Sequence, residues 1–262
     1  MSNGITSVGS AIRRSASLTM GRVTCYRCFW PQKLCWCDSI TPMPTRTKFV
    51  LLMHPKEFKR EKANTGRLAH LCLPNSEIQM GMGFDDNEIV QRQIADPEYH
   101  SVLLYPGLEA HNLSSKDPLP SELSRKPLQV FIIDATWSGA RKMLRISPTL
   151  QRLPRIMFIP TAPSRYVIKH QPQQGCLSTL ESMHELLTVL EKSGLDTYSL
   201  PEQLHSIFDR MQKFQMDCAS DPTLGGYRRQ AYGKTSDRKP FRGKSGSRRR
   251  YLKIWPNPPE AS

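Results

Sequence analysis

Four of the seven cysteines lie close together near the start of the chain, with the spacing Cys25-x2-Cys28-x6-Cys35-x-Cys37. Four thiolates at this spacing can close a tetrahedral zinc site. Nothing in the sequence indicates secretion, so a disulfide framework is not expected. A redox pair would leave two of the four cysteines unexplained. We therefore predict a structural zinc knuckle, with a redox motif or a chance cluster as the alternatives.

Four aromatic residues stand among these cysteines: Tyr26, Phe29, Trp30 and Trp36. A knuckle is too short to build a core from aliphatic residues, and we expect the four rings to form its small hydrophobic core. The alternative is that they offer a stacking surface to a nucleobase. The sequence leaves both readings open.

A second stretch with chemical potential runs over residues 130–137, with the sequence Val-Phe-Ile-Ile-Asp-Ala-Thr-Trp. The continuous apolar run predicts a strand that is buried on both faces, as in a parallel sheet. Ligands of such sheets bind beyond the carboxyl ends of the strands, where Asp134 would lie. Aspartate is also a favoured N-cap. The pattern thus leaves two roles open for Asp134, a functional carboxylate or the cap of the next helix.

The segments that must position these residues alternate between strand-like and helix-like patterns from Thr47 onwards. This alternation predicts an α/β fold with a mainly parallel sheet flanked by helices. Residues 111–126 are expected to be a loop, and Ser178 to open a helix through a Ser-x-x-Glu capping box. The strands are predicted at 48–53, 77–80, 102–105, 130–133 and 155–159, and the helices at 64–73, 85–93, 137–146, 178–192 and 201–217.

Three of the predicted strands end in loops of small, polar or proline residues, at Leu104–Gly107, Asp134–Trp137 and Pro160–Ser164. If these loops share one edge of the sheet, they can wall a pocket for a small molecule. Signatures of several common enzyme classes are missing from the sequence. There is no G-x-G-x-x-G or Walker motif, which argues against dinucleotide oxidoreductases and P-loop enzymes. The absence of a serine nucleophile elbow and of H-E-x-x-H argues against two classes of hydrolase.

The chain is basic, with 37 Lys and Arg against 23 Asp and Glu and a formal net charge of +14. Such a balance favours a polyanionic partner, most commonly nucleic acid, with an acidic membrane surface as the alternative. The longest apolar runs are too short to span a bilayer. Residues 228–250 contain ten basic residues and one acid, interleaved with aromatic residues. This composition predicts a disordered tail that binds RNA or DNA, or that only aids solubility.

The order of short motifs along the chain resembles that of the DTW-domain family, which is named for an Asp-x-Thr-Trp signature. The resemblance covers about residues 25–195 and begins with the CxxC…CxC cysteines. Lys169-His170 departs from it, because the family more often has Arg-Lys there. The other motifs are His54-Pro55-Lys56-Glu57, Asn64-Thr65-Gly66-Arg67-Leu68-Ala69, Leu104-Tyr105-Pro106-Gly107, Asp134-Ala135-Thr136-Trp137, Ala140-Arg141-Lys142-Met143, Ser164-Arg165-Tyr166 and Leu177-Ser178-Thr179-Leu180-Glu181.

The resemblance implies a cytoplasmic tRNA-uridine aminocarboxypropyltransferase with a SPOUT-like, knotted α/β fold. Such an enzyme transfers the 3-amino-3-carboxypropyl group of S-adenosylmethionine to ring nitrogen 3 of a tRNA uridine and releases methylthioadenosine. One alternative is a SPOUT-type RNA methyltransferase that uses the same donor and pocket. The other is a non-catalytic adaptor that binds zinc and RNA.

On this resemblance Asp134 is the catalytic residue, either as the base that takes the uridine imide proton or as the carboxylate that holds the donor's ammonium. Thr136 and Trp137 are expected at the pocket wall; the alternatives are a helix cap for Thr136 and a core anchor for Trp137. The residues expected to bind the donor are Leu104, Tyr105, Pro106, Gly107, Asp134, Thr136, Trp137, Arg165, Ser178 and Thr179.

Ser178 and Thr179 are included because free amides at a helix N-terminus attract an anion such as the donor carboxylate, and ordinary capping is the alternative. Arg165 and Arg67 are candidates for that carboxylate or for a tRNA phosphate, since a guanidinium binds either in bidentate fashion; a surface salt bridge is the alternative. His54 is a candidate titrating group, or simply a histidine packed at a strand end. The residues expected to contact tRNA are Arg67, Arg228, Arg229, Arg248, Arg249 and Arg250.

Four segments are predicted along the chain. Residues 1–22 contain three arginines and no acid, and we expect a disordered leader there, with a mitochondrial-type presequence as the alternative. The zinc knuckle is expected at 23–45, the α/β catalytic domain at 46–220 and the basic tail at 221–262.

Overall fold

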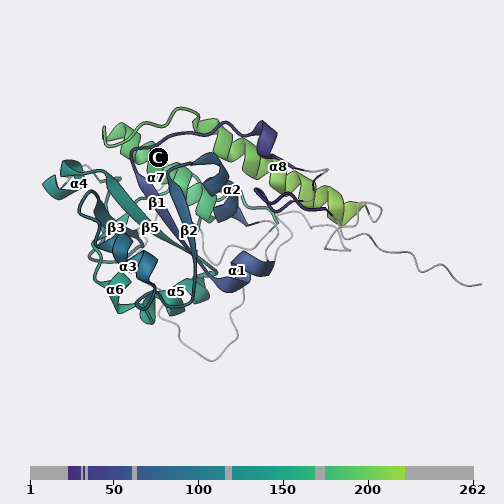
Figure 1. The fold of residues 1–262 in the computed structure, drawn as a ribbon. Helices are drawn as coiled ribbons and strands as arrows, with labels where there is room; N and C mark the ends of the chain where they lie inside the picture. The colour runs from purple at the N-terminus through teal and green to yellow at the C-terminus, as the bar shows by residue number, and fades with distance from the viewer. Residues whose placement is uncertain are drawn as a thin grey trace, which may run out of the picture.

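The computed structural model describes residues 23–30, 32, 35–60, 64–115, 120–168 and 175–221. The predicted leader, the Lys169-His170 departure and the five arginines of the tail lie outside these residues. Within them the chain forms one sheet of six parallel strands in the order β2-β1-β5-β3-β6-β4 (Figure 1). The strands are β1 (Lys48–Met53), β2 (Ser76–Met80), β3 (His100–Leu104), β4 (His111–Asn112), β5 (Leu128–Asp134) and β6 (Arg155–Met157). The predicted parallel α/β class is confirmed.

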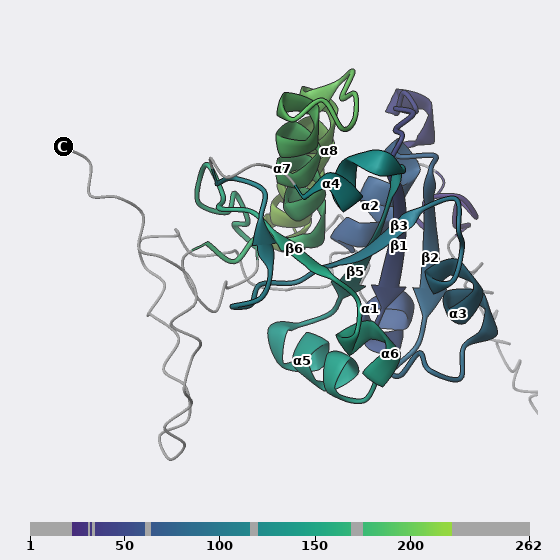
Figure 2. The same ribbon diagram turned by 90° about the vertical axis from the view of Figure 1, so that its left-hand side faces the viewer.

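Helices cover both faces of the sheet, as Figure 2 shows. Successive residues of a strand point to opposite faces, and the two hydrophobic clusters follow this rule. Phe49 and Leu51 of β1 face α2, α7 and α8, while Val50 and Leu52 face α3, α5 and α6. The helices are α1 (Pro55–Arg60), α2 (Thr65–Cys72), α3 (Glu88–Ile94), α4 (Ser121–Arg125), α5 (Trp137–Arg145), α6 (Pro148–Gln151), α7 (Thr179–Lys192) and α8 (Pro201–Ser220).

The predicted capping box at the start of α7 is confirmed. The Ser178 hydroxyl accepts a hydrogen bond from the backbone N–H of Glu181, and the Glu181 carboxylate accepts one from the backbone N–H of Ser178. Two N–H groups that would otherwise be unpaired at the helix start are satisfied in this way. The first turn of α7 is therefore fixed, and with it the neighbouring Thr179.

The prediction of a loop over 111–126 was wrong. His111 and Asn112 form β4 by pairing with Ile156 and Met157 of β6, and α4 begins directly after Pro120. A two-residue edge strand has no periodicity that a sequence pattern can reveal. The short helices α1 and α6 were also missed, and each begins with a proline, which suits the first position of a helix.

The cysteine-rich segment packs directly onto the helical layer made by α2, α7 and α8. Trp30 and Trp36 are buried and stacked with ring centroids 4.3 Å apart, and Trp30 also meets Phe214 of α8 edge-on at 5.2 Å. Both indoles belong to the same hydrophobic cluster as β1 and α7. The knuckle is thus held by the core of the α/β fold. The domain boundaries and the knotted threading stay predictions.

Among the described residues, no helix has both the length and the apolar character that crossing a bilayer requires.

Candidate functional site

Asp134 is the last residue of β5, in the middle of the sheet, and only 5% of its surface is exposed. Its register partner is Met53, the last residue of β1, and its carbonyl accepts a hydrogen bond from the backbone N–H of His54 at 3.0 Å. The residue that caps α5 is Thr136, whose hydroxyl accepts from the backbone N–H of Gly139 at 3.2 Å. The capping alternative for Asp134 therefore does not hold, and the one for Thr136 does.

Two side chains from different helices donate hydrogen bonds to the Asp134 carboxylate. Thr179, the first residue of α7, donates its hydroxyl to Oδ1 at 2.7 Å. Asn64 donates its amide Nδ2 to Oδ2 at 3.1 Å, while its Oδ1 caps α2 by accepting from the backbone N–H of Arg67. The two donors fix the orientation of the carboxylate at the edge of the sheet.

Gly66 allows the N-terminus of α2 to approach this carboxylate. A Cβ atom at Gly66 would lie 2.4 Å from Asp134 Oδ2 and 3.1 Å from its Cγ. No side chain fits at that distance, so glycine is required by space. Asn64 and Gly66 were not predicted as site residues. Both stand in the family motif that begins at Asn64, but an Asn-x-Gly helix start by itself indicates only ordinary capping.

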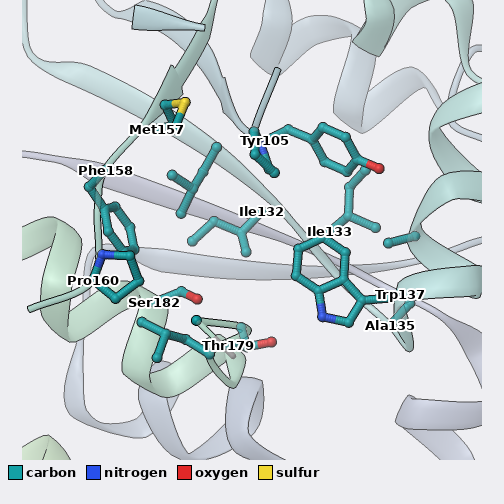
Figure 3. A pocket seen from close by; sticks show the side chains of 15 residues that line it. Tyr105, Ile132, Ile133, Ala135, Trp137, Met157, Phe158, Pro160, Thr179 and Ser182 are labelled. Carbon is teal, nitrogen blue, oxygen red and sulfur yellow. The ribbon is translucent and has the colours of Figure 1, made fainter. Parts of the chain in front are cut away.

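A pocket opens beside Asp134, at the carboxyl ends of β5, β3 and β6 (Figure 3). The indole of Trp137 forms one side, and Phe158 and Pro160 lie across from it. Tyr105 and Ile133 contribute to the wall, and most of the lining is apolar. Thr179 lies in the lining as well, so its hydroxyl connects the pocket with the carboxylate of Asp134. A flat, largely apolar group would fit such a wall, with a charged group towards Asp134.

Five of the residues expected to bind the donor line this pocket: Leu104, Tyr105, Pro106, Trp137 and Thr179. Burial raises the pKa of Tyr105, so its phenol stays neutral. Asp134 lies next to the pocket through Thr179. The structure thus brings together, at one end of the sheet, residues that are up to 75 positions apart in the sequence.

The other four predicted residues do not belong to the pocket lining. Gly107 lies one residue beyond the lining residue Pro106, and Thr136 and Ser178 cap α5 and α7. Arg165 forms a half-exposed ion pair with Asp209 of α8 at 2.6 Å. For Thr136, Ser178 and Arg165 the structure therefore shows the structural alternative named for each of them.

The loop that supplies Pro160 to the pocket is held by two buried carboxylates of α7. Glu181 accepts from the Ser164 hydroxyl at 2.9 Å and from the backbone N–H of Arg165 at 2.6 Å. One turn later, Glu185 accepts from the hydroxyl of Thr161 at 2.8 Å. Through Glu181 the Ser164 motif is hydrogen-bonded to the Ser178 motif, a contact that the sequence alone did not indicate.

Arg67 lies in α2 and contacts the knuckle through Phe29. Its guanidinium stands between the rings of Phe29 and Phe58, 4.6 Å from each centroid, and its Nη2 donates to the Phe58 carbonyl. Burial lowers the pKa of Arg67, and the negative charge of Asp134 opposes this effect. His54 lies at the strand end, and burial and the nearby lysines lower its pKa.

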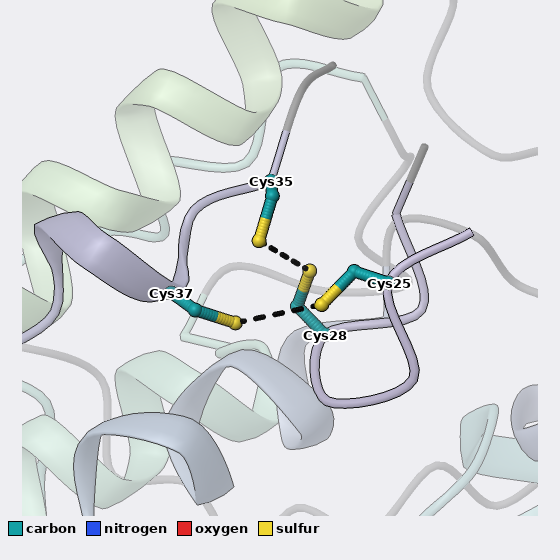
Figure 4. Close-up of side chains that lie close together, drawn as sticks. All are labelled: Cys25, Cys28, Cys35 and Cys37. Atoms are coloured by element: carbon teal, nitrogen blue, oxygen red, sulfur yellow. Dashed lines mark hydrogen bonds between the residues drawn. The ribbon is translucent and has the colours of Figure 1, made fainter. Parts of the chain in front are cut away.

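The four predicted metal ligands converge in the structure (Figure 4). The sulfur atoms of Cys25, Cys28, Cys35 and Cys37 all lie within 4.8 Å of one another. Two of the distances, Cys25–Cys37 and Cys28–Cys35, are 3.8 Å. Tetrahedral coordination with Zn–S bonds of about 2.3 Å requires sulfur–sulfur distances of roughly 3.8 Å. Two of the six distances therefore match this geometry, and the four thiols are close enough together to hold a metal ion.

Backbone amides contribute to the same cluster. The N–H groups of Cys28 and Arg27 donate to the Cys25 sulfur and lower its pKa to about 6, whereas burial raises the pKa of Cys28 and Cys37. Thiolates are the form that binds a metal. A cation at the centre of the four sulfurs would offset the cost of ionising the two more buried ones.

Known proteins similar to this chain point in one direction. Residues 22–216 match the family described as DTW domain. A Drosophila melanogaster protein named tRNA-uridine aminocarboxypropyltransferase 2 is 32% identical over 203 residues, which are 75% of this chain and 76% of that protein. A Mus musculus protein of the same name is 32% identical over 71% of this chain and 62% of its own length. The Arabidopsis thaliana tRNA-uridine aminocarboxypropyltransferase A is 24% identical, over 74% of this chain and 81% of its own length. No solved structure matches the chain.

Proposed function

Because the chain belongs to the DTW domain family, we propose that it is a tRNA-uridine aminocarboxypropyltransferase that uses S-adenosylmethionine as donor. The observation that carries the proposal is the oriented carboxylate of Asp134 at the edge of an apolar pocket. The names of the similar proteins support the reaction class. The formal net charge of +14 supports an RNA substrate.

The bound donor supplies a sulfonium that makes its neighbouring carbon electrophilic. In the transfer a bond forms between this carbon and ring nitrogen 3 of uridine, the carbon–sulfur bond breaks, and its electron pair stays on sulfur, so methylthioadenosine leaves neutral. The imide proton of the uridine must be removed. The protein therefore needs chiefly to aim the correct carbon at the base and to accept one proton.

Trp137 and Tyr105 are the residues that we assign to the adenosine part of the donor, because an aromatic ring can pack on a base. Asp134 is assigned to the aminocarboxypropyl end, where it either takes the imide proton or holds the ammonium group. Thr179 and Asn64 fix the direction of its two oxygens. A carboxylate held from two sides in this way loses little freedom when the reactants bind.

Zinc is the ion that we assign to the four cysteines, because an all-sulfur tetrahedral set is typical of structural zinc sites. The knuckle then needs no free coordination position. Its ligands lie beside the buried Trp30 and Trp36, so the ion would hold the knuckle against α8. The basic residues of the tail are assigned to tRNA phosphates through charge alone.

The reaction can be tested with the purified full-length protein, an unmodified tRNA transcript and S-adenosylmethionine labelled in the carboxypropyl carbons. We expect label in the tRNA and release of methylthioadenosine, both followed by mass spectrometry after nuclease digestion. Label recovered in S-adenosylhomocysteine would instead identify a methyltransferase. A protein that binds tRNA but no donor in calorimetry would be the non-catalytic adaptor.

A further inference from the structure

The structure divides the four aromatic residues of the knuckle into two pairs. Trp30 and Trp36 are 5% and 3% exposed and pack into the core, whereas Tyr26 is 95% exposed and Phe29 is 51% exposed. Large apolar side chains stabilise a fold when they are buried, and the outer pair contributes little of this stabilisation. The buried pair, Trp30 and Trp36, fits the core interpretation. The exposed pair, Tyr26 and Phe29, is accessible for stacking on a nucleobase.

The exposure of the outer pair is built into the backbone of the knuckle. The loop is closed by hydrogen bonds from the backbone N–H of Cys25 to the carbonyl of Trp30, and from that of Phe29 to the carbonyl of Cys25. Phe29 has a φ of 60°, in the left-handed region that a bulky residue rarely adopts. Among the described non-glycine residues it is the only one with positive φ. Strained positions of this kind cluster at functional sites.

The inner face of this loop reaches towards Asp134 through one residue. The Phe29 ring lies on the Arg67 guanidinium, which is close enough to Asp134 to feel its charge. Arg67 is therefore engaged by two phenyl rings and the Phe58 carbonyl. Its buried Nε has no hydrogen-bond partner. A molecule that touches Phe29 would thus be separated from the neighbourhood of the Asp134 carboxylate only by the Phe29 and Arg67 side chains.

Exposed basic residues occur both in the loop and in α1, where Glu57 is the acidic neighbour of Phe58. Arg27 lies between Tyr26 and Phe29 in the loop, and Lys59 follows Phe58 in α1; both are exposed. Aromatic rings interleaved with cations suit single-stranded nucleic acid, whose bases stack on the rings and whose phosphates attract the cations. A protein partner would need a larger apolar patch, since single exposed apolar residues are ordinary on protein surfaces.

We propose that Tyr26 and Phe29 form a stacking surface for an unpaired nucleotide that flanks the target uridine in the tRNA. The proposal rests on the proposed function, because it takes the uridine to lie at Asp134. It names the knuckle as part of the substrate-binding surface, in addition to its structural role. Arg27 and Lys59 would then pair with the phosphates on either side of the stacked base.

The test is the affinity of the full-length protein for an unmodified tRNA transcript at fixed salt. We expect Tyr26→Ala to weaken binding by about 5- to 150-fold, the effect of losing one stacked base. Tyr26→Phe should bind as the wild type does, because the ring is kept. Ile89→Ala on α3, which removes another exposed apolar side chain, is the matched control and should change nothing.

Three results would overturn the proposal: wild-type affinity in Tyr26→Ala, an equal loss in Tyr26→Phe, or an equal loss on a fully paired RNA hairpin. Tyr26 supports no buried contact, so folding of the variant is not at risk; unchanged S-adenosylmethionine binding in calorimetry checks this. The two proposals fail separately. If the labelled donor gives no transfer but Tyr26→Ala still weakens tRNA binding, the proposed reaction is wrong and the stacking surface is supported. If transfer occurs but Tyr26→Ala binds tRNA as the wild type does, the reaction is supported and the stacking surface is wrong.

Discussion

Asp134 and Glu181 are both buried carboxylates, exposed by 5% and 3%, yet they are held in different ways. Glu181 accepts hydrogen bonds from the backbone N–H groups of Ser178 and Arg165 and so joins a helix start to a loop. The donors to Asp134 given above are the side chains of Thr179 and Asn64. One carboxylate satisfies the backbone, and the other is itself kept in place by side chains of two helices.

This difference indicates a structural role for Glu181 and a chemical role for Asp134. A carboxylate that satisfies backbone groups is needed for folding, because those groups would otherwise be buried without a partner. A carboxylate that other side chains orient at a pocket edge costs desolvation free energy and needs a functional reason. We therefore expect substitutions at Asp134 to affect activity and those at Glu181 to affect stability.

The largest effect is expected for Asp134→Asn. The amide is nearly the same size and cannot accept a proton or hold a cation as a carboxylate does. Loss of a general base lowers the rate by about 10²- to 10⁴-fold, and we expect a loss in this range in the labelled-donor assay. The melting temperature should stay close to that of the wild type, because the oxygen of the new amide can still accept from Asn64 and its NH₂ can donate to the Thr179 hydroxyl, which, unlike a backbone N–H, can also accept. A variant that unfolds as readily as Glu181→Gln would remove the distinction between the two carboxylates.

Gly66→Ala tests whether the position of Asp134 matters independently of its charge. The new Cβ would lie 2.4 Å from Oδ2, so the carboxylate must move. A misplacement of about 1 Å can cost around 100-fold in rate, and we expect a loss of this order. Gly83→Ala is the matched control, because the atoms nearest to its new Cβ all belong to Ile146, which does not line the pocket. Full activity in Gly66→Ala would show that Asp134 tolerates displacement.

Glu181→Gln should lower stability and leave the chemistry intact. Its NH₂ group would face a donor, so one backbone N–H of Ser178 or Arg165 loses its acceptor. An unsatisfied buried group costs about 1–3 kcal/mol, measurable as a shift in the urea midpoint. Glu202→Gln, an exposed position at the start of α8, provides the control. A large fall in transfer rate at a temperature where the variant is folded would contradict the structural role.

The sequence was sufficient to predict the parts of the site that depend on local pattern. The apolar run before Asp134 predicted a central parallel strand, and the Ser178 capping box predicted the start of α7; both are confirmed. The cysteine spacing predicted a four-ligand cluster, and the four sulfurs do converge. In each case one short segment contains all the information.

What could not be predicted depends on residues that meet only in three dimensions. The sequence indicates that Asn64 is a helix cap. Nothing near Asn64 shows that its amide nitrogen reaches Asp134, 70 positions later. Arg165 looks like an anion-binding residue until α8 places Asp209 beside it. The burial of Trp30 depends on its contact with Phe214 of α8, which no local pattern records.

The smallest expected effect concerns pH. Its measurement separates two causes of lost activity in acid, loosening of the fold and protonation of a group at the Asp134 site. His184 of α7 is half-buried and hydrogen-bonded through Nδ1 to the Tyr198 hydroxyl, and its ring lies against that of His205, with centroids 3.9 Å apart and planes tilted by 38°. Burial, and secondarily His205, lowers its pKa, while Glu185 and Glu202 oppose this.

Because the unfolded state binds this proton more readily than the folded state, the free energy of unfolding falls as the pH drops through about 6.5, the pKa of an unperturbed histidine. Protonation of His184 destabilises α7, the helix that contains both Thr179, which donates to Asp134, and Glu181. We expect His184→Gln, whose side-chain amide can still form a hydrogen bond with the Tyr198 hydroxyl, to lose less stability between pH 7 and 5 than the wild type, as measured by urea denaturation. If wild type and variant lose transfer activity in parallel over this range, then acid inactivation arises at the site and not from loosening of α7.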